Sequence, residues 1–332
     1  MHVAEIALGD PLKIGVQFFT KQSIVVIDYN VKEFLAFSGG ISTEVAPLEQ
    51  ESRRLIMMYT RGIEGGISMP IDFHAESNRF AYTRRQADPS WVAAIKSIVD
   101  VRGKRVLDIG CGGGIYSKAL AEMGATSVTG VDFSEEALKG ARENCRDYAS
   151  IDFVVGNALN TGLPDQQCDL ILERALIHHL GRENVQACFV EGLRLLKPGG
   201  TLIVQDRTPG DCLLPANSKN LRGYFFARYP KLINKEVERR LDNEFVLSTL
   251  QNVGFKHIQE HKLWETRRTY PNFDELREDL LSRTGRSILH ELSDEELADL
   301  VAYIQEQLHG NDEQAIVERD RWTIWSAQKG EQ

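Results

Sequence analysis

The sequence predicts a doubly wound α/β fold, in which helices cover both faces of a mostly parallel sheet. Between residues 105 and 206, five short apolar segments alternate with segments that carry apolar residues at helical spacing. Apolar strands that alternate with amphipathic helices form βαβ units, and their sheet is buried on both faces. A glycine cluster also follows the first of these strands directly, where open parallel sheets bind their ligands.

This alternation fixes the order of the expected elements. We expect strands at 105–109, 127–132, 151–155, 169–173 and 201–206, separated by helices at 115–123, 135–148 and 182–196. The stretch "LKPGG" at 196–200 predicts the end of the last of these helices and a turn.

Beyond Asp206 the order changes. We expect an aromatic-rich segment (212–232), a helix (243–252), a strand (256–268), a polar helical insert (273–308) and a closing strand (321–328).

The sequence before residue 105 contains one well-defined helix start. Asp88 is a suitable N-cap and Pro89 suits the first helical position. Further upstream, two short strands (14–19 and 23–28) and a helix (47–59) predict a small accessory unit without recognisable chemistry.

Composition limits the partners and the compartment. The 332 residues are 42% hydrophobic and 26% charged, and the net charge of −9 provides no general basic field for nucleic acid or an anionic membrane. The five cysteines are widely spaced, which favours a reducing compartment over a disulfide framework. No secretion signal and no apolar stretch of about 20 residues is present, so a cytoplasmic location is expected.

The glycine turn suggests what kind of ligand binds. Gly110, Gly112 and Gly114 allow the backbone to approach a ligand closely. A nicotinamide-binding turn has its third glycine where Ile115 stands, and Asp108 is a poor neighbour for a pyrophosphate. The turn therefore favours a ligand with a cationic, amino-acid-like end. A tight turn without a ligand is the structural alternative.

The next strands end in further polar groups. Asp132 ends the second strand and can accept both hydroxyls of a ribose, as the acid of a dinucleotide site does. Asn157 and the amide of Ala158 follow the third strand and suit an adenine edge. Together these strand ends describe an adenosine that carries an amino acid.

The motifs "VLDIGCGGG", "VTGVDFSEEAL", "VVGNALNTGLPDQQCDLIL" and "LRLLKPGGTLIV" occur in this order over roughly 100 residues. This region resembles the class I S-adenosylmethionine-dependent methyltransferases, in particular the small-molecule branch similar to ubiquinone and menaquinone methyltransferases. The resemblance implies a Rossmann-like sheet with a final antiparallel strand. From the order of the elements we expect an accessory extension (1–75) and a methyltransferase domain (76–332) with cap insertions at about 211–242 and 273–310.

The resemblance assigns roles to individual residues. Asp108 and the backbone near Gly110 would hold the methionine moiety, and Asp132 would hold the ribose. Glu173 would face the methionine amine or the acceptor. The implied cofactor site comprises Asp108, Gly110, Gly112, Gly114, Asp132, Phe133, Asn157, Ala158 and Glu173.

Methyl transfer to a protonated acceptor needs a base, whereas an anionic or carbon acceptor needs only alignment. His178 and His179 follow the fourth strand and are the candidate bases; packing and capping are their structural alternatives. Tyr82 is a further candidate, in a segment (76–86) that is expected to roof the site.

The acceptor is expected to be a small molecule. The turn after the fourth strand lacks the Asn/Asp-Pro-Pro-aromatic motif of enzymes that methylate nucleic acid bases. A second roof candidate (221–232) carries aromatic residues together with Arg222 and Arg228, which either bind an acceptor carboxylate or remain in solvent while the aromatics pack. No ligand set for a metal is apparent.

Two other functions remain open on the sequence alone. A non-catalytic S-adenosylmethionine-binding protein would show the same motifs. A nicotinamide-dependent oxidoreductase is disfavoured by Ile115 and Asp108.

Overall fold

The computed structural model describes residues 3–7, 13–17, 86–308 and 315–331, and the chain divides into two compact units, residues 1–69 and 70–332. In the first unit, strand β1 (Val3–Ala7) pairs antiparallel with β2 (Lys13–Gln17). The strand predicted at 14–19 overlaps β2, whereas β1 was not predicted. The strand predicted at 23–28 and the helix at 47–59 lie outside the described residues.

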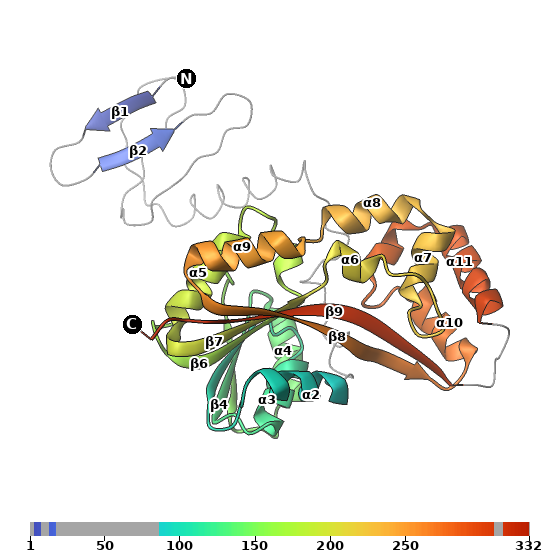
Figure 1. Cartoon of the computed structure of the whole chain (residues 1–332), viewed down its shortest axis with the longest axis horizontal. Helices are drawn as coiled ribbons and strands as arrows, with labels where there is room; N and C mark the ends of the chain where they lie inside the picture. Colours follow the sequence, from blue (N-terminus) through green and yellow to red (C-terminus); the bar gives the residue numbers. More distant parts are fainter. Residues whose placement is uncertain (1–2, 8–12, 18–85, 309–314, 332) are drawn as a thin grey trace, which may run out of the picture. The chain divides into compact units, whose positions relative to one another are not determined.

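A seven-stranded sheet organises the second unit (Figure 1). Its strands are β3 (Arg105–Ile109), β4 (Ser127–Asp132), β5 (Ile151–Val155), β6 (Cys168–Arg174), β7 (Leu196–Asp206), β8 (Lys256–Tyr270) and β9 (Ile316–Gln328). The order is β5-β4-β3-β6-β7-β9-β8, and β9 alone runs antiparallel to its neighbours. The predicted fold, a mostly parallel Rossmann-like sheet with a final antiparallel strand, is confirmed. Because the order reverses beside β3, the glycine turn after β3 lies at the switch point.

Helices cover both faces of this sheet (Figure 1). They are α2 (Pro89–Ile98), α3 (Ile115–Glu122), α4 (Glu135–Asn144), α5 (Val185–Leu195) and α9 (Asn243–Val253). One apolar core joins α2 and α3 to the sheet, and a second joins α5 and α9 to the opposite face. The capping prediction for α2 is confirmed, because the Asp88 carboxylate accepts a hydrogen bond from the amide of Ser90.

The stretch "LKPGG" differs from its prediction. Helix α5 ends at Leu195 as expected, but strand β7 begins at Leu196 without a separate turn. The pairing of β6 with β7 shifts register between Cys168 and Leu170, and Gly199 has a φ of 74°. The glycine therefore serves an irregularity inside the strand, for which a left-handed residue is suited.

A helical layer, here called the cap, is built from the two segments that flank α9 and β8. It comprises α6 (Pro209–Cys212), α7 (Arg222–Arg228), α8 (Lys231–Glu238), α10 (Phe273–Leu281), the short 3₁₀ helix η3 (Ser287–Glu291) and α11 (Asp294–Gln307). The cap has its own apolar core, which includes Tyr224, Phe225 and Phe226. Arg240, after α8, forms an ion pair with Asp206 at the end of β7, so the cap contacts the carboxyl edge of the sheet.

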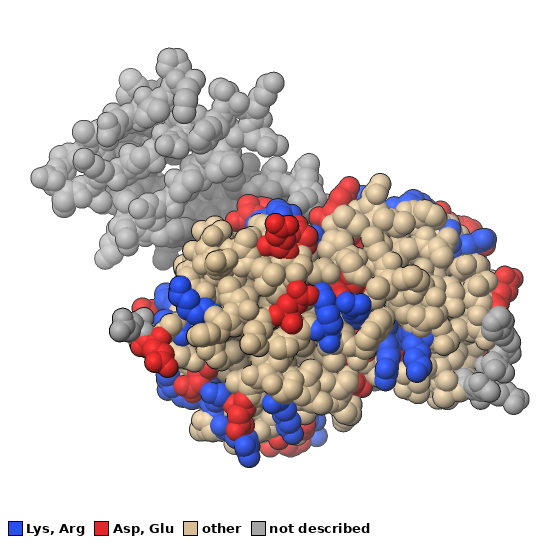
Figure 2. Space-filling view, in the orientation of Figure 1, with Lys and Arg blue, Asp and Glu red and all other residues tan. Residues whose placement is uncertain are grey.

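Within the described part of the chain, no helix is long and apolar enough to cross a membrane. All five cysteines are buried free thiols. On the face shown in Figure 2, Lys and Arg side chains are interspersed with Asp and Glu.

Candidate functional site

The glycine turn connects β3 to α3, and each of its three predicted glycines has a left-handed backbone. Their φ angles are 75° at Gly110, 50° at Gly112 and 75° at Gly114. A Cβ at Gly114 would lie 3.0 Å from the Phe153 ring, whereas a Cβ at Gly112 would meet nothing within 4 Å. Gly114 therefore allows the turn to pack closely against β5, and Gly112 leaves open space beside the turn.

The amide groups of this turn are bonded within the protein. Gly110 and Cys111 both donate to the carbonyl of Val131, and Gly112 donates to Asp132 Oδ2 at 2.9 Å. The amides of Gly110, Cys111 and Gly112 are therefore occupied within the protein. The turn favours ligand approach mainly because side chains are absent.

Asp108 lies beneath the turn on the α3 face of the sheet. Its carboxylate is 2% exposed and accepts a hydrogen bond of 2.6 Å from Ser117 Oγ. Burial raises the pKa of Asp108 to about 6, and the neighbouring charge of Asp132 contributes to this rise. None of the described Lys or Arg side chains forms an ion pair with it. A cationic group beside Asp108 would stabilise its charged form.

Asp132, at the end of β4, is held in a fixed orientation. Its two carboxylate oxygens accept hydrogen bonds from the amides of Gly112 and Ser134, both at 2.9 Å. A carboxylate oxygen has two lone pairs, so a carboxylate held in this way can also accept hydrogen bonds from ribose hydroxyls. The next residue, Phe133, is half exposed, as a surface for adenine stacking would be.

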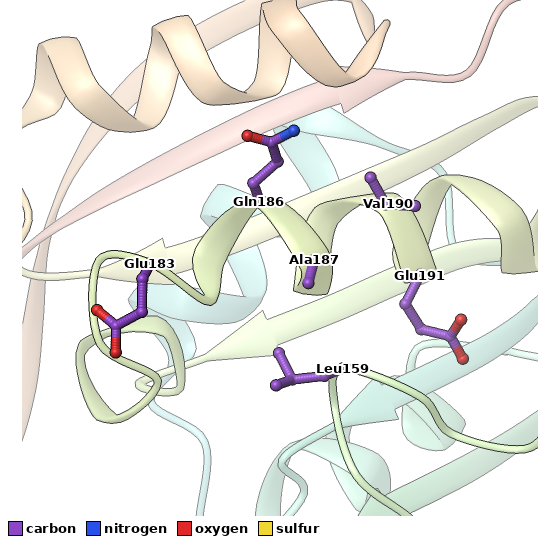
Figure 3. Close-up of a pocket in the computed structure, with 6 residues that line it drawn as sticks. All are labelled: Leu159, Glu183, Gln186, Ala187, Val190 and Glu191. Carbon is purple, nitrogen blue, oxygen red and sulfur yellow. The ribbon is translucent and has the colours of Figure 1, made fainter. Parts of the chain in front are cut away.

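The segment after β5 places Asn157 and Ala158 at the same edge. Asn157 Oδ1 accepts a hydrogen bond from the amide of Leu159, and Ala158 packs into the core on the α5 face. Beside this segment, Leu159 and α5 line an open surface hollow of about 430 Å³ (Figure 3). Its lining residues include Glu183, Gln186 and Val190. The hollow does not involve the glycine turn, so it adds nothing to the proposed methionine site.

Glu173 lies on the face of the sheet opposite to Asp108. Its Oε1 accepts a hydrogen bond of 3.5 Å from the Cys188 thiol of α5, and none of the described residues forms a hydrogen bond with its Oε2. Burial raises the pKa of Glu173 to about 8. A carboxyl group that faces α5 does not face the methionine amine, so its role in cofactor binding stays a prediction that this geometry does not favour.

His178 and His179 lie in a 3₁₀ turn, η2 (Ile177–His179), directly after β6. Their rings pack against each other at a tilt of 41° with centroids 3.8 Å apart, and the Leu176 side chain that precedes them lies against Gly110. His178 Nδ1 lies 2.8 Å from Asp206 Oδ2. Burial lowers the pKa of both imidazoles, so the pair is neutral near pH 7. The structure thus brings the histidines close to the glycine turn.

Sequence reasoning missed a cluster of charged and aromatic residues contributed by the end of β6 and by α3, β8 and β9. The Arg174 guanidinium lies over the rings of Tyr116 and Trp322 and donates to Glu265 at 2.8 Å. Glu265 also accepts a hydrogen bond of 2.8 Å from the Tyr116 hydroxyl. Because Tyr116 lies in the first turn of α3, this cluster adjoins the glycine turn.

The predicted roof segments have different outcomes. Tyr82 lies outside the described residues, as does the rest of the segment 76–86 up to residue 85. In the second segment the aromatics pack into the cap, while Arg222 pairs with Glu236 and Arg228 pairs with Asp299. These two arginines are therefore occupied within the protein, and the aromatics follow the packing alternative. Among the described side chains, no group of three or more His, Cys, Asp or Glu could hold a metal.

Comparison with known proteins identifies the central part of this unit. Residues 107–204 match the family model "Methyltransferase domain". Demethylmenaquinone methyltransferase of Tropheryma whipplei (strain Twist) is 33% identical over 145 residues, which are 43% of this chain and 59% of that protein. Ubiquinone biosynthesis O-methyltransferase of Pseudomonas fluorescens (strain Pf0-1) is 36% identical over 118 residues, 34% of this chain and 48% of that protein. The match thus spans about half the length of these curated relatives.

Solved structures show the same fold for the methyltransferase domain and its surroundings. A protein of Anabaena variabilis ATCC 29413, assigned to an antibiotic biosynthesis pathway as a methyltransferase, aligns with a TM-score of 0.56. It is 21% identical, and the alignment covers 72% of this chain and 98% of that one. Phosphoethanolamine N-methyltransferase 2 of Haemonchus contortus, in complex with S-adenosyl-L-methionine, aligns with a TM-score of 0.51 at 20% identity, covering 80% and 61%. At these identities the likeness concerns the fold.

Proposed function

We propose that the chain binds S-adenosylmethionine at the carboxyl edge of β3–β5 and transfers its methyl group to a small-molecule acceptor. The observation that carries the proposal is Asp108, a buried carboxyl group with no ion-pair partner among the described residues, beside a turn that has lost its side chains. A ligand with a cationic amino acid end complements both features. The match of residues 107–204 to a methyltransferase domain supports the same conclusion.

The proposed arrangement assigns one task to each strand end. Asp108 attracts the cationic end of the cofactor, Asp132 accepts the ribose hydroxyls, and Phe133 with Asn157 and Ala158 meets the adenine. When bound, S-adenosylmethionine supplies an electrophilic methyl group on a sulfonium. The protein's contribution is to align an acceptor with that methyl, exclude water and, for a protonated acceptor, accept a proton.

The acceptor class is also part of the proposal. The curated relatives are named for menaquinone and ubiquinone biosynthesis, and the structural neighbour from Haemonchus contortus is named for a phosphoethanolamine. All of these are small molecules. We therefore propose a small-molecule acceptor, with nucleic acid and membrane excluded as partners, and a cytoplasmic protein made of an accessory extension (1–75) and a catalytic domain (76–332).

Calorimetry on the full chain tests the cofactor. We expect S-adenosylmethionine and S-adenosylhomocysteine to bind and a nicotinamide dinucleotide to leave the protein unchanged. Binding of the nicotinamide dinucleotide without binding of S-adenosylmethionine would favour an oxidoreductase over a methyltransferase. Binding without production of S-adenosylhomocysteine from any acceptor in a broad screen would favour the non-catalytic alternative.

A further inference from the structure

We propose that Asp206 is a positioning residue that fixes His178 as the proton acceptor of this site. The methyl acceptor is then a protic group, such as a hydroxyl, a thiol or an ammonium, which must lose a proton during the reaction. The inference rests on the proposed function and deepens it to a substrate class.

The hydrogen bonds to Asp206 determine which ring nitrogen of His178 carries the proton. Asp206 Oδ1 accepts from the amide of Arg207 at 2.8 Å and from Arg240 Nη1 at 3.0 Å. Oδ2 accepts from the backbone amide of His178 at 3.3 Å and lies 2.8 Å from its Nδ1. A carboxylate held by these donors is ionised and can only accept, so Nδ1 must be the protonated nitrogen. The lone pair of the neutral ring is then on Nε2.

The surroundings of His178 suit a proton acceptor. No hydrogen bond to Nε2 is made by the residues that the structure describes, and the side chain retains 11% exposure. The charged groups that act on the His178 ring are Asp206 from β7 and Arg239 and Arg240 after α8. The His179 ring packs against the His178 ring. The arginines and burial favour the neutral ring before reaction. Asp206 lies where it would stabilise the cation formed after proton uptake.

With His178 as the base, every proton and electron pair of the methyl transfer has a defined destination. The acceptor X–H gives its proton to Nε2 of His178, and its electron pair forms the new bond to the methyl carbon. The bond from that carbon to sulfur breaks, and its electron pair stays on sulfur, which gives S-adenosylhomocysteine. The imidazolium later releases its proton to water. A carbanion or a tertiary amine would require none of these steps, so a carboxylate behind the imidazole would serve no catalytic purpose.

The tautomer of His178 can be measured without knowing the acceptor. In the full chain with ¹⁵N-labelled histidine, NMR at pH 7.5 should show the Nδ1–H tautomer for the signal that His178→Gln removes. Asp206→Asn should abolish this preference and lower the pH at which His178 titrates. Asp320→Asn makes the same acid-to-amide change in a carboxylate that is likewise buried and paired with an arginine but contacts neither histidine, and it should leave the signal unchanged. An Nε2–H tautomer, or an unchanged signal in Asp206→Asn, would overturn the positioning role.

The substrate class is tested with a panel of phenols, thiols and primary amines, each matched by its fully methylated analogue. Only the protic members should yield S-adenosylhomocysteine, and Asp206→Asn should lower kcat about 10²-fold with unchanged affinity for S-adenosylmethionine. Turnover with no protic member, or equal turnover with the capped analogues, contradicts the class. If S-adenosylmethionine itself does not bind the wild type, the proposed function fails. The tautomer of His178 still tests separately whether Asp206 positions the His178 ring.

Discussion

Glu173 and Asp206 are carboxyl groups near the ends of neighbouring strands, β6 and β7, and both are almost completely buried. Their pKa values nevertheless move in opposite directions. Burial raises the pKa of Glu173 to about 8, since the hydrogen bond from the Cys188 thiol, its one partner among the described residues, offsets only part of the rise. Burial also opposes ionisation of Asp206, but the neighbouring His178 and Arg240 and the amide of Arg207 hold its pKa well below the usual range. At equal burial, the partners decide whether a carboxyl group carries its charge.

The largest expected effect comes from removing Asp206, the charged carboxyl group of the two. Asp206→Ala leaves Arg240 and the amides of Arg207 and His178 without their shared acceptor, and it should lower the free energy of unfolding by about 3–5 kcal/mol at pH 7. Urea unfolding followed by tryptophan fluorescence measures this. Asp165→Ala, which removes an exposed partner of Arg194, is the control and should cost less than about 1 kcal/mol. Equal losses in the two variants would mean that burial of the Asp206 pair has no energetic consequence.

Glu173, the neutral carboxyl group of the two, predicts an unusual dependence of stability on pH. The pKa of Glu173 is raised from an ordinary value of 4.5 to about 8, so its contribution to stability is complete below pH 4.5 and is lost as pH rises toward 8. Between pH 5 and 7.5 the loss amounts to about 3 kcal/mol. Urea unfolding at several pH values should show this slope in the wild type, and Glu173→Gln should remove most of it. A slope that persists in Glu173→Gln would assign it to another group.

The contrast between these two residues also shows what one sequence can reveal. The strands, the glycine turn and the acids at the strand ends were predictable, because local periodicity and short motifs encode them. The partners were not, since Arg240 is 34 residues from Asp206 and Glu265 is 91 residues from Arg174. The family resemblance implied that Glu173, at the end of a strand, faces the ligand. Its orientation depends on the pairing of Glu173 with Ile109, a register that no local signal gives.

Asp132 is a third carboxylate for this comparison, and its contribution should be seen in the affinity for the ligand. Asp132→Asn keeps one acceptor oxygen, for the amide of either Gly112 or Ser134, and loses the charge that accepts ribose hydroxyls. We expect affinity for S-adenosylmethionine to fall about 10- to 100-fold, or roughly 1–3 kcal/mol, in calorimetry. Asp152→Asn, on the exposed side of β5, is the matched control and should bind as the wild type does. Unchanged affinity in Asp132→Asn would remove this residue from the site.

The smallest expected effect concerns Asp108, whose properties are intermediate between those of Glu173 and Asp206. It is buried like Glu173, but the proposed ligand would bring it a cation, as Arg240 does for Asp206. Burial raises its pKa to about 6, so the group is about one tenth ionised at pH 5 and about nine tenths ionised at pH 7. If the ionised form binds the ammonium group, affinity for S-adenosylmethionine should rise about tenfold over this interval, and Asp108→Asn should abolish the rise. Methylthioadenosine has the same nucleoside without the amino acid, so its affinity should not follow this titration. The same tenfold rise for methylthioadenosine would show that the pH dependence arises at the nucleoside end, and that the charge of Asp108 is not what the cofactor recognises.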